Sequence, residues 1–307
     1  MRYPKKLEAG ATIGLVSPCS PIPPERRDAC IKLLEDMGFK VKASPNISSV
    51  YASYMAGEAR ERGRWMNAMF ADPEVDAIFC IRGGDGGNRI WKYLDLDIVR
   101  KNPKIFVGYS DVTTFHLAFN QLCDLVTFHG PMVSSNMLEH FDEETKNSFF
   151  EALNAREPYE FKNPQGYDIR VMHEGRASGR LTGGNLTLVC ASIGTPYEID
   201  CRGKILFLEE VHGDVAGMDR IMMQLINSGK LEECSGILLG QFTDIEEPDS
   251  PDYQYMELFM DLLSDVKKPV FYNIQSGHDF PMMTLPMGAM ISMDSETGQI
   301  LIRPDMS

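Results

Sequence analysis

The first half of the chain alternates short apolar runs with amphipathic segments, and this rhythm limits the folds open to it. Thr12–Ser17 and Val75–Ile81 are continuous apolar runs, as expected of strands buried on both faces of a sheet. The segments 23–37 and 58–70 between them have the apolar spacing of helices. This order predicts a mostly parallel sheet covered by helices. Further strands are expected at 40–43, 104–107 and 125–128, and a helix over 111–122.

The rhythm weakens after Asn154, which suggests a second domain. Residues 156–175 are polar, include two prolines and two glycines, and are typical of a connection between domains. We therefore predict an N-terminal domain over 1–155 and a C-terminal domain over 176–307, a division that suits a chain of 307 residues. Within the second domain we expect helices at 185–193, 215–227 and 253–263, strands at 204–208 and 236–241, and a turn at 295–298 between two short strands.

The overall charge excludes some partners. The net charge is −14 and no run of Lys or Arg exceeds two residues, which argues against nucleic acid and anionic membranes as partners. The seven cysteines are widely spaced without a Cys-x-x-Cys pair, so neither a disulfide framework nor a zinc knuckle is expected. The N-terminus lacks an apolar leader and no stretch is long enough to span a membrane, so we expect a cytoplasmic protein.

The segment Phe106–Thr114 combines a strand end, a glycine and a serine ahead of a helix. Gly108 permits a tight turn, and Ser110 would stand clear of the sheet near the N-terminus of the helix. This arrangement is typical of a nucleophile elbow, although the sequence reads Gly-Tyr-Ser-Asp-Val rather than Gly-x-Ser-x-Gly. An ordinary N-cap formed by Ser110 or Asp111 explains the same residues, so the segment by itself leaves both readings open.

Four glycines lie within five residues in the segment Ile81–Arg89. Their backbone amides can approach a ligand closely. A dinucleotide fingerprint fails because Arg89 occupies the third glycine position counted from Gly84, and a Walker motif fails because no Gly-Lys-Ser/Thr follows. The segment favours an oxyanion hole or a cradle for a carboxylate, with a plain turn as the alternative.

Acid and base candidates occur in the second half of the chain. Glu209 and Glu210 end a strong apolar strand, where a carboxylate can orient a histidine, although a solvated strand end explains the spacing more simply. His278 lies in a loop beside a glycine, a context that suits a general base, and His129 is the rival base. Together with Ser110, these residues supply the three residue types of a hydrolytic triad.

Seven segments, taken in order, resemble the LD-carboxypeptidase family of serine peptidases, which includes the muramoyl-tetrapeptide carboxypeptidases and the microcin-C-immunity peptidases. Lys104–Asp111 is the most specific of them. The segments span nearly the whole chain: Ile13–Pro18, Arg82–Gly84, Lys104–Asp111, Phe128–Pro131, Leu181–Leu186, Ile205–Glu209 and Gly277–His278. The resemblance implies an N-terminal flavodoxin-like α/β domain with a parallel sheet, followed by a smaller C-terminal α/β domain.

The resemblance also implies a role for each candidate residue. Ser110 would be the nucleophile, His278 the general base and Glu209 the acid that orients it, with the following glutamate as the competing choice. The amides of Gly84 and Asp111 would form the oxyanion hole. The implied reaction releases a C-terminal D-amino acid, usually D-Ala, from a cytoplasmic murein tetrapeptide through an acyl-enzyme. It serves peptidoglycan recycling and needs no metal or other cofactor. A homodimer is also implied.

Two departures from the family pattern concern the substrate. Asp85 stands where the tetrapeptide enzymes commonly carry an aromatic residue, and its carboxylate would repel an anionic substrate terminus unless Arg82 or Arg89 offsets it. We therefore regard these three residues as candidates for substrate binding. The segment after Glu210 also lacks the aromatic and proline residues often found there.

Three other functions compete with the tetrapeptide carboxypeptidase. One is an amidase resembling the microcin-C-immunity peptidases, which would cleave acyl-sulfamoyl adenylates. Another is a non-catalytic binding protein on the same scaffold, in which the three triad residues would lie too far apart. A flavodoxin-like cofactor protein is disfavoured because no phosphate-binding loop is present.

Overall fold

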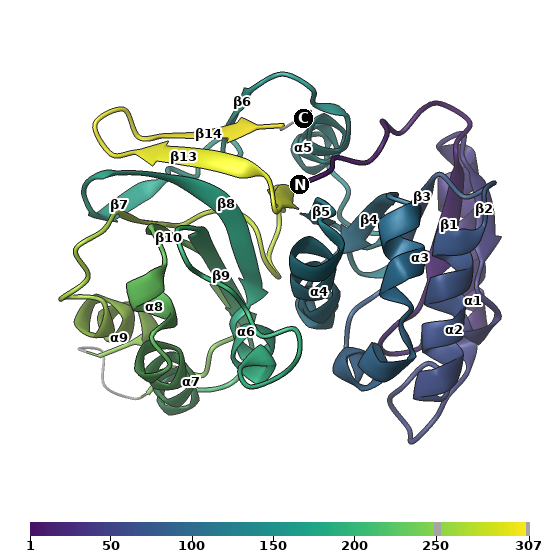
Figure 1. Ribbon diagram of the computed structural model, residues 1–307, viewed down its shortest axis with the longest axis horizontal. Helices are drawn as coiled ribbons and strands as arrows, with labels where there is room; N and C mark the ends of the chain where they lie inside the picture. Colours follow the sequence, from purple (N-terminus) through teal and green to yellow (C-terminus); the bar gives the residue numbers. More distant parts are fainter. Residues whose placement is uncertain (249–252, 305–307) are drawn as a thin grey trace. The chain divides into compact units, whose positions relative to one another are not determined.

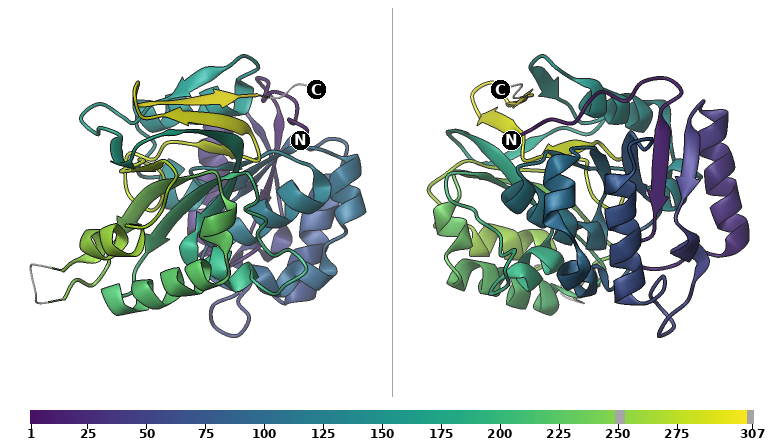
Figure 2. Two further views of the ribbon diagram at one scale, coloured as in Figure 1. Left: turned by 60° about the vertical axis from the view of Figure 1, so that its left-hand side comes forward. Right: turned by 45° about the vertical axis from the view of Figure 1, so that its right-hand side comes forward.

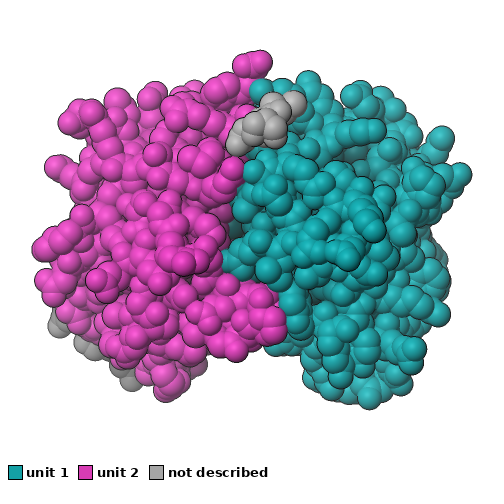
Figure 3. All heavy atoms as spheres, viewed as in Figure 1, with its two compact units in different colours: residues 1–156, 284–288, 305–307 teal, residues 157–283, 289–304 magenta. Residues whose placement is uncertain are grey.

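The structure, a computed structural model, describes residues 1–248 and 253–304. The chain divides into two compact units, coloured separately in Figure 3. Unit 1 comprises residues 1–156 and 284–288, and unit 2 comprises residues 157–283 and 289–304. Residues 284–288, which we predicted to lie in the C-terminal domain, thus belong to unit 1. The last residues of that predicted domain, 305–307, lie outside the described residues.

Unit 1 is built on one sheet with the strand order β12-β5-β4-β3-β1-β2. Strands β1 to β5 run parallel in the order β2-β1-β3-β4-β5, which is the flavodoxin order, so the predicted fold of the N-terminal domain is confirmed. The last strand, β12, pairs antiparallel with β5 and covers that edge. The strands are β1 (Thr12–Val16), β2 (Lys40–Ala43), β3 (Ala77–Cys80), β4 (Ile105–Gly108), β5 (Thr127–His129) and β12 (Leu285–Met287).

Helices cover both faces of this sheet (Figures 1 and 2). They are α1 (Pro24–Asp36), α2 (Ala59–Ala71), α3 (Leu96–Lys101), α4 (Thr113–Cys123) and α5 (Glu143–Asn154). On the face of α1 and α5, Phe79 packs edge-on against Phe149 at 5.6 Å. On the other face, Phe106 packs against Phe119 of α4 at 5.1 Å and Phe70 of α2 at 6.2 Å. Each buried ring contributes about 1.5–3 kcal/mol by leaving water, which holds the helices to the sheet.

Unit 2 is a mixed sheet with helices. Its strand order is β6-β14-β13-β8-β9-β10-β11-β7. Strands β8, β9, β10 and β11 are parallel, whereas β13, β14 and β6 on one side and β7 on the other pair antiparallel. The strands are β6 (Tyr159–Phe161), β7 (Arg170–His173), β8 (Arg176–Asn185), β9 (Ile205–Val211), β10 (Gly236–Thr243), β11 (Val270–Tyr272), β13 (Met290–Asp294) and β14 (Gln299–Arg303). The helices are α6 (Leu186–Ser192), α7 (Val215–Asn227), α8 (Lys230–Glu233) and α9 (Tyr255–Leu262).

The stretch 156–175 differs from the connection that we predicted. Two of its segments form the strands β6 and β7, which close the two edges of the sheet in unit 2. The physical reason is the free backbone at each edge, where unpaired N–H and C=O groups accept another strand even from a polar, proline-containing segment.

Parallel strands place their following loops at one edge of each sheet. In unit 1, the loops after β1, β3 and β4 all leave the carboxyl edge of the sheet. In unit 2, Glu209 lies near the carboxyl end of β9 and His278 follows β11. Loops at the carboxyl edge are where α/β sheets commonly place their reactive groups.

Candidate active site

The turn after β4 holds Ser110 in an uncommon backbone conformation. Ser110 has φ of +64°, in the left-handed region that costs a serine free energy, and begins the short 3₁₀ turn Ser110–Val112 that leads into α4. Neither this turn nor α4 is capped by a side-chain hydrogen bond from Ser110, which removes the reading of Ser110 as an ordinary N-cap. A strained serine between a strand and a helix is the geometry of a nucleophile elbow.

The glycine-rich segment after β3 lies directly against this turn. A methyl group on Gly83 would come 2.9 Å from Cβ of Ser110 and 3.2 Å from its Oγ, so the loop approaches the serine as closely as glycine allows. The backbone N–H of Ser20 donates to the carbonyl of Gly83 at 3.1 Å, and the N–H of Asp85 donates to Oγ of Ser20 at 3.0 Å. Unit 1 therefore brings together the first two sequence segments that we singled out.

The three candidate substrate-binding residues do not form a charge-balanced group. Asp85 is exposed. Arg89 donates to the hydroxyl of Tyr54 at 3.3 Å, and Arg82 donates to the carbonyl of Pro21 at 3.5 Å. Within the described part of the chain neither arginine forms an ion pair with Asp85, so the charge of that carboxylate is left to solvent.

In unit 2, the two neighbouring glutamates of β9 have different partners. Glu209 is fully buried, and its Oε2 lies 2.7 Å from Nδ1 of His278. Glu210 accepts hydrogen bonds from Nδ2 of Asn185 at 2.7 Å, from the N–H of Thr187 at 2.8 Å and from the N–H of Val211 at 2.9 Å. Consecutive strand residues point to opposite faces, so one glutamate reaches the histidine and the other secures the start of α6. The reading of Glu209 as a solvated strand end is wrong.

The Glu209–His278 contact sets the charge preference of the imidazole. Burial of the ring favours the neutral form, but the charge and hydrogen bond of Glu209 outweigh burial and raise the pKa of His278 above its ordinary value. Burial raises the pKa of Glu209, and His278 opposes this rise. An Nδ1–H donated to a carboxylate leaves Nε2 as the nitrogen that can accept a proton during a reaction.

His129, the rival base, lies inside unit 1. It is fully buried on β5, where the rings of Tyr109 and His116 pack against it at 5.8 and 6.2 Å. His116 is also buried; its Nε2 donates to the carbonyl of Gly108 at 2.8 Å, and burial lowers its pKa to about 4. Both rings are fully buried in unit 1 and contribute to its packing.

Several residues that support these segments were missed in the sequence. Arg62 is 1% exposed, yet in the sequence it reads as part of the charged face of an amphipathic helix. Cys19 and Ser20 follow β1 and carry no local signal of function. Asn185 belongs to the segment Leu181–Leu186, which contributes to the family resemblance, but its bond to Glu210 is not predicted by the sequence.

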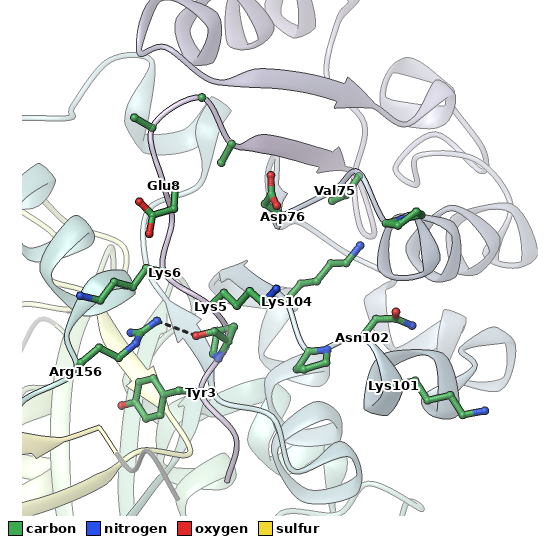
Figure 4. A pocket seen from close by; sticks show the side chains of 16 residues that line it. Tyr3, Lys5, Lys6, Glu8, Val75, Asp76, Lys101, Asn102, Lys104 and Arg156 are labelled. Atoms are coloured by element: carbon green, nitrogen blue, oxygen red, sulfur yellow. Dashed lines mark hydrogen bonds between the residues drawn. The ribbon is translucent and has the colours of Figure 1, made fainter.

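A cavity of about 1110 Å³ lies in unit 1 at the opposite edge of the sheet, before the starts of β1, β3 and β4 (Figure 4). Most of the charged side chains in its lining are cationic, but two of these cations are used by the fold. Nζ of Lys104 donates to the carbonyls of Met69 and Asp72 at the end of α2. Arg156 donates to Pro4, as the dashed line shows, and to Ala155 at the end of α5. Its lining includes neither Ser110 nor the glycine-rich segment after β3.

A smaller cavity of about 310 Å³ lies in unit 2 beside the loop that carries His278. It is lined by the amides of Gln241 and Gln275, by Asp279 and by aromatic rings that include Tyr255 and Tyr272. The backbone N–H of Asp279 donates to Oε1 of Gln241 at 3.0 Å, which ties the cavity wall to the histidine loop.

No helix in the described ranges 1–248 and 253–304 is long and apolar enough to cross a membrane. The same residues do not gather three or more His, Cys, Asp or Glu side chains in a group that could hold a metal ion.

Comparison with known proteins places the chain in a family. Residues 13–130 match the LD-carboxypeptidase N-terminal domain, and residues 178–293 match the LD-carboxypeptidase C-terminal domain. The chain belongs to the LD-carboxypeptidase family. It is thus a peptidase of the family that the sequence segments resemble, and the family assignment made from them is confirmed.

Individual members of the LD-carboxypeptidase family are similar along their whole length. A protein of Bacillus subtilis (strain 168) named "Probable murein peptide carboxypeptidase" is 34% identical over 307 residues, which cover 99% of this chain and 95% of that protein. The structure of microcin C7 self immunity protein MccF in complex with aspartyl sulfamoyl adenosine matches with a TM-score of 0.92 at 25% identity, covering 100% of this chain and 99% of that one. Muramoyltetrapeptide carboxypeptidase from Oxalobacter formigenes matches with a TM-score of 0.85 at 27% identity, covering 97% and 100%.

Proposed function

We propose that this LD-carboxypeptidase releases a C-terminal D-amino acid, D-Ala, from a murein tetrapeptide by acyl-enzyme catalysis. The observation that carries the proposal is the 2.7 Å contact between the fully buried carboxylate of Glu209 and Nδ1 of His278. Because burial of a carboxylate is costly, a buried acid that orients an imidazole has the chemistry of a triad rather than of a surface ion pair. Ser110, in its strained turn, is the proposed nucleophile.

The mechanism follows from these assignments. Oγ of Ser110 attacks the carbonyl carbon of the L,D-amide while Nε2 of His278 takes its proton. The N–H groups of Gly84 and Asp111 stabilise the negative oxygen of the tetrahedral intermediate. The C–N bond breaks, D-Ala leaves with the proton from His278, and the shortened peptide remains as an ester on Ser110. Water, deprotonated by His278, attacks this ester and returns the serine, while Glu209 holds the ring and stabilises its positive charge.

The choice of a murein peptide is supported by the 34% identical relative from Bacillus subtilis, whose name carries that substrate. The second candidate is an amidase acting on acyl-sulfamoyl adenylates, favoured by the likeness to MccF, which was solved with aspartyl sulfamoyl adenosine. Asp85, which is exposed and forms no ion pair among the described residues, bears on this choice because it would repel the free carboxylate of a tetrapeptide. A cytoplasmic location, a role in peptidoglycan recycling and a homodimer belong to the same proposal.

Mass spectrometry of a murein tetrapeptide ending in D-Ala tests the proposal, with Ser110→Ala as the matched inactive variant. We expect the wild type to release one D-Ala and the variant to release none. Cleavage of an aminoacyl-sulfamoyl adenylate but not of the tetrapeptide would select the amidase. Failure to cleave either compound would favour the non-catalytic binding protein.

A further inference from the structure

One peptide group in the glycine-rich loop is held at both ends by buried, oppositely charged side chains. Nη1 of Arg62 donates to the carbonyl of Gly86 at 2.9 Å, and the N–H of Gly87 donates to Oδ2 of Asp111 at 2.5 Å. This carbonyl and this N–H belong to the same peptide group. A cation therefore binds its negative end and a carboxylate binds its positive end, which fixes its orientation. We call this arrangement the peptide clamp.

The charges of the peptide clamp are withdrawn from water. Arg62 is 1% exposed and Asp111 is 4% exposed. Arg62 also donates to the carbonyl of Pro18, and the thiol of the buried Cys19 hydrogen-bonds with Asp111. The clamp thus joins α2, the loop after β1, the glycine-rich loop and the nucleophile turn. Replacing buried charges by apolar side chains of similar size is often neutral or stabilising, so the proposal rests on the bonds that these two charges make and not on their contribution to stability.

The geometry in question is that of the two proposed oxyanion donors. Asp111 supplies one donor through its own N–H, and its carboxylate holds the end of the loop that carries the other donor, Gly84. The opposite end of the loop is fixed by Ser20 and by the close approach of Gly83 to Ser110. Removing the charge of Asp111 would take a favourable carboxylate away from the buried Arg62 and weaken the bond to Gly87, so the loop would shift relative to the serine.

We propose that Arg62 and Asp111 are positioning residues that hold the amides of Gly84 and Asp111 at the spacing which an oxyanion requires. This inference rests on the proposed function in one respect, that Ser110 is the nucleophile. It does not depend on the substrate. Donors must lie about 2.7–3.1 Å from the oxygen on which the charge develops, and loss of one such donor typically costs roughly 10²–10³ in kcat. A loosened clamp therefore lowers the rate of attack by Ser110 while leaving substrate binding nearly unchanged.

The clamp depends on pH through Asp111. Burial raises the pKa of this carboxyl to about 6, against the hydrogen bonds from Gly87 and Cys19. The charged neighbours are Asp85 of the same loop, which raises the pKa further, and Arg62 of α2, which lowers it. The carboxylate is thus charged at pH 7.5 and increasingly protonated below pH 6, where the clamp loses its negative end.

The experiment measures the second-order rate at which a fluorophosphonate inactivates the whole protein at pH 7.5. In this reaction a bond forms between Oγ of Ser110 and phosphorus, the P–F bond breaks, fluoride leaves and the serine proton passes to the general base. The variants are Asp111→Asn, Arg62→Gln and the double variant, in which no buried charge is left without its opposite. Asp36→Asn, at an exposed acid on α1, is the matched control.

We expect Asp111→Asn and Arg62→Gln each to slow inactivation about 10–100-fold. The double variant should be no slower than the worse single one, because both side chains act on one peptide group. Asp36→Asn should react at the wild-type rate. With a cleavable substrate, kcat should fall by the same factor and KM should change less than about twofold.

The outcomes separate the clamp from the proposed function. A wild type that reacts while all three variants react equally fast overturns the clamp and leaves the nucleophile assignment standing. Additive losses in the double variant also overturn it. If a single variant does not fold, the inactivation rate of the double variant, in which neither buried charge remains, tests the clamp instead. A wild type that does not react at all overturns both, whereas a reactive wild type that spares the tetrapeptide overturns only the proposed substrate.

Discussion

Replacement of Glu209 by glutamine removes one charge from a buried pair and keeps the size of the side chain. Its carboxylate is fully buried and lies 2.7 Å from Nδ1 of His278. A glutamine amide can donate to Nδ1 and so favour the wrong tautomer of the ring. In serine proteases the corresponding exchange of aspartate for asparagine lowers kcat about 10⁴-fold, and a similar loss here amounts to about 5.5 kcal/mol of transition-state stabilisation.

The same substitution should also shift the pH profile of kcat/KM in a definite direction. The pKa of His278 is raised by Glu209, so the wild-type kcat/KM should increase with pH through a value above the ordinary histidine pKa of about 6.5. In Glu209→Gln burial of the ring is less opposed, and the acid limb should move to lower pH. Stopped assays of kcat/KM from pH 5 to 9 measure both the loss and the shift.

Glu210→Gln is the matched control, because the two side chains are neighbours on β9. The carboxylate of Glu210 accepts three hydrogen bonds, and a glutamine amide cannot accept all of them. We expect this variant to keep kcat within tenfold and to lose about 1–3 kcal/mol of unfolding free energy. Urea unfolding at pH 8 compares the two proteins. If Glu210→Gln loses more activity than Glu209→Gln, the assignment of the acid is wrong.

Three further predictions address the turn, the loop and the buried core of unit 1. Ser110→Ala and Ser110→Gly should both lose activity by a factor on the order of 10⁶. The unfolding free energy of Ser110→Gly should exceed that of Ser110→Ala by about 1 kcal/mol, because glycine tolerates φ of +64°. Equal stability of the two variants in urea would contradict the strain. Gly83→Ala should lower kcat roughly 10²-fold without unfolding the protein, since its methyl group would come 2.9 Å from Cβ of Ser110, and a fully active variant would show that the contact is not tight. His116 has its pKa lowered to about 4, so as pH falls below about 6.5 the unfolded chain binds the proton first and stability declines. His116→Gln should therefore abolish about 2 kcal/mol of the loss in unfolding free energy between pH 7 and pH 5, and an unchanged loss would contradict the burial of a neutral ring.

Local patterns in the sequence predicted those helices and strands whose own residues show a clear apolar spacing. The strand Lys40–Ala43 and the helix Val215–Asn227 have the predicted bounds, and Val75–Ile81 contains the fully buried β3. These segments combine a clear period with turn or glycine boundaries, which neighbouring residues alone can specify. The order of strands and helices in the first half predicted the parallel sheet, and the family resemblance implied its flavodoxin-like form.

Other elements depend on contacts that the local sequence does not contain. Strand β8 was not predicted, because Gly179, Gly183 and Gly184 lower its strand propensity. A methyl group on Gly183 would lie 1.9 Å from the carbonyl of Phe207, so this glycine is required by the close packing of β8 on β9. Strand β12 likewise pairs with β5 across a long separation in sequence, which no local pattern indicates.

The sequence by itself determined the family, through seven segments in order, and the parallel sheet, through its alternating pattern. It also supplied the candidate site residues, because Ser110, the glycine-rich loop and Glu209 lie at the ends of predicted strands and His278 lies in a loop beside a glycine. Only the tertiary structure decided which glutamate contacts His278, because consecutive strand residues face opposite sides and their partners come from distant loops. It alone identified Arg62 and Asp111 as holders of the Gly86–Gly87 peptide group. Burial and hydrogen bonding between distant segments are properties of the folded chain, so a charged residue that looks solvated in the sequence can be a buried part of the site.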